Sequence, residues 1–304
     1  MKVVVLGPRK RSPCEEWIFK EAKRSFKKAV YAEIPKTVVK NGNVIYENFV
    51  LNDFDCIIPR IPRTYAWYGF ILLSKLLKEC YLPLTPESVI LAHNKFLTLV
   101  ALKEAGIPVP KTYLAYSRDV LEKLAKRMKY PVVLKLIYGS LGRGVMFADS
   151  LESAKSIMDA LERFRQPIFL EEYVENPGED IRAFVLGDKV LAAEKRVAPK
   201  RERRTNIGIG GKGVAIKKLD PEIEDIAVRA SHALGMEISG IDIIESEKGP
   251  VVIEANVNVH FEGLTKVTGI NVAKHIVEFV KKETKEFKRP PLRRFFEWLG
   301  RRFT

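Results

Sequence analysis

A single stretch, VVIEANVNVHFEG at 251–263, restricts what this chain can fold into. Its first residues, VVI, read as a strand buried in a core. Polar side chains then follow at every second position: Glu254, Asn256, Asn258 and His260. Side chains of a strand alternate between its two faces, so we expect these four to point the same way. The fold must therefore bury this strand and still bring its polar face to a site.

The preceding segment, GIDIIE at 240–245, is the expected hairpin partner of this strand. With the turn near 247–249, Asp242 lies across from Glu254, and Asn256 shares their face. Such oxygen ligands suit Mg²⁺, which often shares them with nucleotide phosphates. The alternative is a polar face open to solvent, but the apolar neighbours favour a core, where carboxylates need cations or donors.

The order of the remaining elements predicts an α/β start followed by an α+β region. Strand, helix, strand and helix are expected at 2–7, 14–29, 55–62 and 68–80. This order favours a parallel sheet with ligand groups at the carboxyl ends of its strands. Hairpins and helices follow, and a length of 304 residues suits two or three domains.

Composition narrows the function class only partly. The net charge of +14 fits nucleic acid, an anionic membrane surface or acidic substrates. Three scattered cysteines without metal-ligand spacing suggest a reducing cytoplasm. No apolar run approaches the ~20 residues that span a bilayer. Abundant Lys and Glu beside a single Gln lean towards a thermophile.

Three further motifs each allow two interpretations. GSLGRG at 139–144, with Lys135 upstream, is either a phosphate-binding loop or a plain glycine-rich turn, and it lacks the Gly-Lys-Ser/Thr of a Walker loop. LEEYV at 170–174 is either a strand end or a hinge that hydrogen-bonds an adenine edge. The arginine- and glycine-rich segment 195–213 is either solvated surface or an active-site lid.

Taken together and in order, these motifs resemble ATP-grasp ligases, and within them the RimK-like amino-acid ligases. The resemblance runs from about Asp55 to Val280 through DCIIPRIPRTYAWYGFILL, NKFLTLVALKEAGIPVPKT, PVVLKLIYGSLGRGV, LEEYV, EDIRAFVLG, RRTNIGIGG, GIDII and EANVNVHFEGLTKVTGI. It implies a three-domain ATP-grasp fold with the nucleotide between the central and C-terminal domains. The expected limits are an N-terminal α/β domain at 1–90, ATP-grasp subdomains at 91–170 and 171–285, and a basic tail at 286–304.

The resemblance also implies site residues. ATP would be bound through its phosphates, ribose and adenine by Lys95, Lys135, Ser140, Gly142, Gly144, Glu172, Tyr173, Asp180, Arg204, Thr205 and Asn206. One or two Mg²⁺ ions, or Mn²⁺, would be held by Asp242, Glu254 and Asn256. The catalytic set would be Arg182, Arg204 and Lys135, with Arg182 stabilising an acyl-phosphate.

The implied reaction joins a carboxylate to an amine with release of ADP and phosphate. The resembled enzymes add an amino acid, here expected to be glutamate, to a peptide, a protein C-terminus or a coenzyme carboxylate. Alternatives are a lysine-biosynthesis-type carrier-protein ligase and a non-catalytic ATP-binding regulatory protein. The chain departs from its relatives at 257–263 and 207–209, near the acceptor, where His260 is a general base, a pocket wall or a structural group. The positive charge favours an acidic acceptor.

The last residues, EFKRPPLRRFFEWLGRRFT at 286–304, predict a basic amphipathic helix. Such a helix packs on its own body or on a second copy in a homo-oligomer. The alternatives are docking on a membrane surface or an acidic partner, and binding to nucleic acid.

Overall fold

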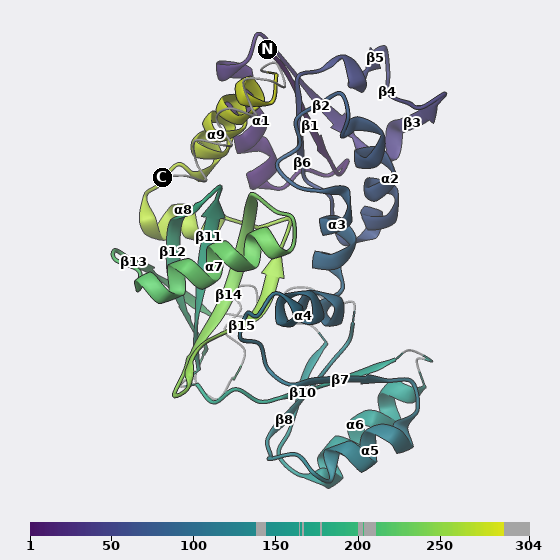
Figure 1. Cartoon of the computed structure of the whole chain (residues 1–304), viewed down its shortest axis with the longest axis vertical. Helices are drawn as coiled ribbons and strands as arrows, with labels where there is room; N and C mark the ends of the chain where they lie inside the picture. The colour runs from purple at the N-terminus through teal and green to yellow at the C-terminus, as the bar shows by residue number, and fades with distance from the viewer. Residues whose placement is uncertain are drawn as a thin grey trace, which may run out of the picture. The chain divides into compact units, whose positions relative to one another are not determined.

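The computed structural model describes residues 1–137, 144–163, 165, 167–176, 178–199, 203 and 211–288. It divides into two compact units (Figure 1), Met1–Val89 with Asn271–Thr304, and Ile90–Ile270. The domain limits expected at 90, 170 and 285 stay a prediction, and the helix that starts at Val272 belongs to the first unit. Most of the predicted tail lies outside the described residues. Within them, no helix combines the length and apolar character needed to cross a bilayer.

The first unit is built on a three-stranded parallel sheet in the order β2-β1-β6. The strands are β1 (Lys2–Gly7), β2 (Lys28–Glu33) and β6 (Cys56–Pro59). The four residues from Val3 to Leu6 are fully buried, as expected of a parallel strand covered on both faces. The parallel sheet predicted for the start of the chain is thus present.

Helices and a small antiparallel sheet complete the first unit. The helices are α1 (Pro13–Ser25), α2 (Ala66–Leu76), α3 (Pro86–His93), which crosses the unit boundary, and α9 (Val272–Phe287), with 3₁₀ turns η1 (Ile34–Lys36), η2 (Leu51–Asp53) and η3 (Arg63–Tyr65). The small sheet comprises β3 (Thr37–Lys40), β4 (Asn43–Tyr46) and β5 (Phe49–Val50). Helix α9 packs along α1 (Figure 1).

One predicted boundary is wrong in this unit. The helix expected over 14–29 ends at Ser25, and Lys28 already begins β2. The helical pattern in the sequence runs on to residue 29, but the chain there already pairs with β1 in the parallel sheet, with Val30 opposite Val4. Tertiary pairing therefore overrides the local helical preference.

The second unit starts with a four-stranded antiparallel sheet in the order β7-β10-β8-β9. Its elements are α4 (Lys95–Glu104), β7 (Thr112–Ala115), α5 (Arg118–Ala125), β8 (Val132–Lys135), β9 (Val145–Ala148), α6 (Leu151–Glu162) and β10 (Ile168–Glu172). Helices α5 and α6 cover one face, where Leu134 and Leu170 join Met158 in a buried core (Figure 1). Lys135 and Glu171, one position further along their strands, therefore face the other way.

A five-stranded antiparallel sheet in the order β13-β12-β11-β14-β15 forms the rest of this unit. Its elements are β11 (Glu179–Leu186), β12 (Lys189–Val197), β13 (Lys212–Ile216), α7 (Pro221–Ala233), β14 (Ile238–Ser246), β15 (Gly249–Asn256) and α8 (Glu262–Thr268). The two hairpins predicted in this region are present, with Gly187-Asp188 at one turn. Asp242 pairs with Glu254, as their spacing predicted.

Candidate active site

One face of the five-stranded sheet carries a row of charged side chains. Directly paired residues of neighbouring strands lie on the same face. The register therefore sets side by side, from β12 to β15, Glu194, Arg182, Asp242 and Glu254. This row contains Glu254 of the polar face that the alternation in VVIEANVNV predicted, but β15 ends at Asn256, so Asn258 and His260 lie beyond the strand and that part of the prediction is wrong.

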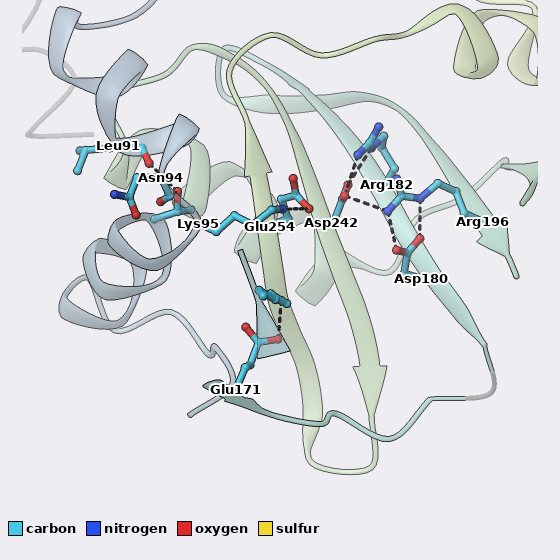
Figure 2. A network of polar contacts seen from close by, with 11 residues as sticks. Leu91, Asn94, Lys95, Glu171, Asp180, Arg182, Arg196, Asp242 and Glu254 are labelled. Atoms are coloured by element: carbon cyan, nitrogen blue, oxygen red, sulfur yellow. Dashed lines mark hydrogen bonds and ion pairs between the residues drawn. The ribbon is translucent and has the colours of Figure 1, made fainter. Parts of the chain in front are cut away.

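Asp242 is the centre of the row. It is 1% exposed, and its carboxylate is bound by Arg182 from the adjacent strand β11 and by Arg196 from β12, one strand further away (Figure 2). The Nε and Nη2 atoms of Arg182 donate to its two oxygens at 2.8 and 2.7 Å. The Nη2 atom of Arg196 lies 2.9 Å from its Oδ2 atom. The side chain of Asp242 is thus fixed from two sides.

Arg196 also binds a second carboxylate. Its Nε and Nη2 atoms donate to the two oxygens of Asp180 at 2.7 and 2.5 Å. Both residues are almost fully buried, and they pair directly across β11 and β12. Such two-pronged contacts between a guanidinium and a carboxylate are strong and directional. One planar guanidinium therefore holds Asp180 and Asp242 together.

These contacts set the charge state of the network. Burial alone would raise the pKa of Asp242, but the positive charges and hydrogen bonds of Arg182 and Arg196 outweigh it and lower that pKa to about 2. Burial would likewise lower the pKa of Arg196, and the two aspartates raise it instead. Asp242 and Arg196 are therefore both ionised in the neutral pH range.

Two lysines approach this region from other elements. Lys95, at the start of α4, lies with its Nζ atom 2.9 Å from Oε2 of Glu254 (Figure 2). The preceding residue, Asn94, caps the helix by accepting from the backbone N–H groups of Phe96 and Leu97. Burial alone would raise the pKa of Glu254, but the positive charge of Lys95 outweighs burial and lowers that pKa.

Lys135 comes from the other sheet of the same unit. Its Nζ atom lies 2.6 Å from Oε1 of Glu171, and both side chains are nearly buried. The second oxygen of Glu171 has no hydrogen-bond partner. The ammonium group also lies 5.7 Å from the centre of the Phe169 ring. Lys135 is the last residue of β8, and its ammonium group is held by Glu171. An anion of a ligand could take the place of that carboxylate.

An open cavity brings these groups together, and its empty space, including the part open to solvent, is about 710 Å³. Its charged lining has four cationic and five acidic side chains: Lys95, Lys135, Arg196, Arg203, Glu171, Glu179, Asp180, Asp242 and Glu254. The cavity can therefore hold a ligand that carries both anionic groups and their counter-cations.

The remaining wall of the cavity is apolar and partly aromatic. Besides Asn176, it comprises Val133, Val145, Phe147, Tyr173, Val174, Ile244 and Ile253. Phe147 and Tyr173 meet edge to face with their ring centres 6.0 Å apart. The guanidinium of Arg203 lies over both rings, at 5.5 and 5.8 Å from their centres, and pairs with Asp149 at 2.7 Å. A flat aromatic ligand group fits such a wall.

The expected cation ligands Asp242, Glu254 and Asn256 lie at this site. Among the described residues, no group of three or more His, Cys, Asp or Glu gathers to hold a metal. The set on this face instead comprises the carboxylates of Asp242 and Glu254 and the amide of Asn256, which lies on the same side of β15 as Glu254. The Nδ2 atom of Asn256 is buried and has no hydrogen-bond partner. Oxygen donors of this kind fit Mg²⁺ that also binds phosphate.

The other predicted residues lie as follows. Gly144 has a φ of +83°, and a Cβ atom there would come within 3.0 Å of Leu136, so this position needs glycine. Glu171 and Tyr173 line the cavity, whereas Glu172 does not, and its backbone N–H donates to the carbonyl of Lys111. Five predicted residues lie outside the described part of the chain: Ser140, Gly142, Arg204, Thr205 and Asn206.

Sequence reasoning missed the buried partners of the site. Arg196 falls within the segment 195–213, yet it lies in β12, where it is buried two positions after the buried Glu194. The available signal was this spacing, because residues two apart on a strand share a face. Glu194 is 2% exposed, its Oε2 atom has no hydrogen-bond partner, and burial raises its pKa.

Comparison with known proteins agrees with this fold. Residues 92–280 match the RimK-like ATP-grasp domain. A probable alpha-L-glutamate ligase from Legionella pneumophila (strain Corby) is 40% identical over 239 residues, which cover 77% of this chain and 78% of that protein. A probable alpha-L-glutamate ligase 1 from Hahella chejuensis is 37% identical over 252 residues, covering 82% of each.

Solved structures share the fold at low sequence identity. A RimK domain ATP-grasp protein from Sphaerobacter thermophilus superposes with a TM-score of 0.71 at 20% identity, covering 92% of this chain and 99% of that one. The ATP-grasp ligase PsnB, complexed with minimal precursor, Mg and ADP, gives 0.73 at 16% identity, covering 93% and 97%. The chain belongs to the RimK-like ATP-grasp family, and it is an ATP-dependent ligase that forms an amide bond.

Proposed function

We propose that this enzyme adds an amino acid, glutamate in the first instance, to an acidic acceptor such as a peptide, a protein C-terminus or a coenzyme carboxylate. The observation that carries the proposal is the single cavity in which Lys95 and Lys135 face the row that contains Asp242 and Glu254. The names of the most similar relatives support glutamate as the added amino acid. The excess of positive charge supports an acidic acceptor.

The nucleotide is proposed to lie between the two sheets of the second unit. The apolar wall around Phe147 and Tyr173 would receive the adenine, and Asp180 would lie on the ribose side. Lys95 and Lys135 would bind phosphate oxygens, each leaving its present carboxylate partner. The cation ligands would be Asp242, Glu254 and Asn256.

In the proposed reaction, an oxygen of the acceptor carboxylate attacks the γ-phosphorus of ATP, and the bond to the bridging oxygen of ADP breaks. The protein contributes position and charge rather than a covalent intermediate of its own. Lys95, Lys135 and Arg182 spread the negative charge that develops on the transferred group. When bound, Mg²⁺ would neutralise phosphate charge. The amine then attacks the acyl carbon, and phosphate leaves with the oxygen that it took from the carboxylate.

A substrate screen tests this proposal. ADP release is measured with ATP and Mg²⁺ while amino acids are paired with candidate carboxylates, and mass spectrometry identifies each product. We expect release to require both substrates and the product to carry one or more added amino acids. Release with a different amino acid would overturn the glutamate assignment, and release without an amide product would overturn the ligase reaction proposed here.

A further inference from the structure

The carboxyl edge of the parallel sheet in the first unit has the topology of a ligand site. The chain leaves β1 through α1 and returns as β2 on one side of β1. It leaves β6 through α2 and returns at Tyr81, which bridges Cys56 on the other side of β6. The connections from these two neighbouring strands therefore diverge. In open α/β sheets, ligands bind at the carboxyl ends of strands where this divergence occurs.

Two basic segments meet at this point. Leu6 of β1 pairs with Pro59 of β6, and the backbone N–H of Arg60 donates to the carbonyl of Leu6 at 2.7 Å. The segment after β1 carries three cations and the segment after β6 carries two: Arg9, Lys10 and Arg11, then Arg60 and Arg63. We call the five residues the basic edge. Sequence neighbours of two separate strands thus place their positive charges together.

Acidic side chains offset only part of this charge. Glu15, in the first turn of α1, pairs with the buried Arg60 at 2.9 Å. Glu16 pairs with Arg11 at 3.3 Å. Arg9 and Lys10 are exposed and form no ion pair with any described residue. Glu33, the last residue of β2, lies at the same edge but pairs with Lys36 at 3.0 Å. Of the basic edge, Arg9 and Lys10 thus remain exposed.

The opposite edge of the same sheet is arranged differently. There, Lys288 and the backbone N–H of Lys2 both contact Asp55. The ammonium of Lys28 lies over the Phe49 ring, 4.3 Å from its centre. Lys28 and Lys288 at the amino edge are thus held against partners, whereas Arg9 and Lys10 at the carboxyl edge are exposed.

Part of the basic edge is rigid. The guanidinium of Arg11 lies 3.9 Å from the centre of the Tyr31 ring, and the hydroxyl of Tyr31 donates to the carbonyl of Pro8 at 2.8 Å. The loop after β1 is therefore tied to β2. Preorganised guanidinium groups lose little entropy when they bind carboxylates, and they bind them with two parallel hydrogen bonds.

We propose that the basic edge binds the acceptor substrate as a peptide with several neighbouring carboxylates. This inference rests on the proposed function, because it assigns a docking site to the acidic acceptor of that reaction. The ligand class follows from the chemistry: repeated carboxylates match exposed Arg9 and Lys10 and the fixed Arg11. Substitutions at the basic edge would therefore weaken acceptor binding and leave nucleotide binding unchanged.

The test is a binding measurement that does not need catalysis. The anisotropy of a fluorescein-labelled oligo-α-L-glutamate peptide is titrated with the wild type, with R9E/K10E and with the milder R9Q/K10Q. The matched control is K27E/K78E, which makes the same charge change at two exposed lysines outside the basic edge. We expect R9E/K10E to weaken binding about tenfold, with a smaller loss for R9Q/K10Q and little change for the control.

Several outcomes would overturn the proposal. Equal affinities for R9E/K10E and K27E/K78E would show that only net charge matters. Tighter binding of a single-stranded oligonucleotide than of the peptide would indicate a nucleic-acid surface. ATP binding and ADP release are measured on the same preparations. No ATP binding or ADP release by the wild type would count against the proposed function. Normal ATP binding and ADP release together with equal peptide affinities of R9E/K10E and K27E/K78E would count against the basic edge alone.

Discussion

Replacing Arg196 with methionine is the sharpest test of the buried network. The guanidinium is 2% exposed and makes two hydrogen bonds to Asp180 and one contact of 2.9 Å to Asp242. The change removes one partner of a buried charge network and leaves two aspartates beside an apolar side chain. Breaking a buried ion pair in this way costs about 3–5 kcal/mol.

The matched control is Arg229→Met. Arg229 lies on α7 with half of its side chain exposed, and it pairs with Asp225 at 3.2 Å. Exposed pairs of this kind contribute about 0.3–0.5 kcal/mol. The two substitutions remove the same atoms, so their difference isolates the buried contacts. The double variant D180N/R196M should cost less than the sum of its single changes, because the two residues interact directly.

Stability is measured by urea unfolding followed by far-UV circular dichroism. Tryptophan fluorescence is unsuited, because Trp17, Trp67 and Trp298 all lie outside Ile90–Ile270, the unit that contains the network. We expect a lower free energy of unfolding for Arg196→Met than for Arg229→Met, by about 3 kcal/mol or more. Equal values for the two variants would refute the inference that Arg196 stabilises this sheet.

Three further predictions concern the site. Asp242→Ala or Glu254→Ala should abolish ADP formation that depends on Mg²⁺, and full activity in both variants would contradict the proposed cation site. The lowered pKa of Asp242 means that its ionised form adds stability above its ordinary pKa of 3.8 and that this stability is lost as pH falls through about 2. Asp242→Asn should therefore lose less stability than the wild type over this acidic range in circular dichroism, and equal losses would argue against the shift. Tyr173→Ala should weaken binding of a fluorescent ATP analogue by about 1–3 kcal/mol through lost stacking on the adenine, and unchanged affinity would exclude Tyr173 from the nucleotide site.

The sequence predicted those parts of the fold that repeat a local pattern. The pairing of Asp242 with Glu254 followed from the alternation in VVIEANVNV and from the position of the turn. The parallel start followed from the alternation of strands and helices. Strand β2 was missed because Lys28 and Ala29 continue a helical pattern, and only pairing with β1 decides their conformation. Strand pairing between distant segments is not visible in a local pattern.

The site shows the same division. Lys95, Lys135, Asp242 and Glu254 were expected at one site and do line one cavity, whereas their roles remain predictions. The double grip of Arg196 on Asp180 and Asp242 could not be predicted, because it depends on three strands coming together. The contact of Arg203 with Phe147 and Tyr173 likewise joins residues from distant segments. Partners that meet only after folding need the structure.

The central claim is that ATP activates the acceptor carboxylate as an acyl-phosphate. It is tested most directly with an acceptor whose carboxyl oxygens are labelled with ¹⁸O, incubated with the wild-type enzyme, ATP, Mg²⁺ and L-glutamate. The proposed mechanism predicts that each amide formed is accompanied by one ¹⁸O atom in the released inorganic phosphate, detected by mass spectrometry. Amide formation with unlabelled phosphate would contradict it.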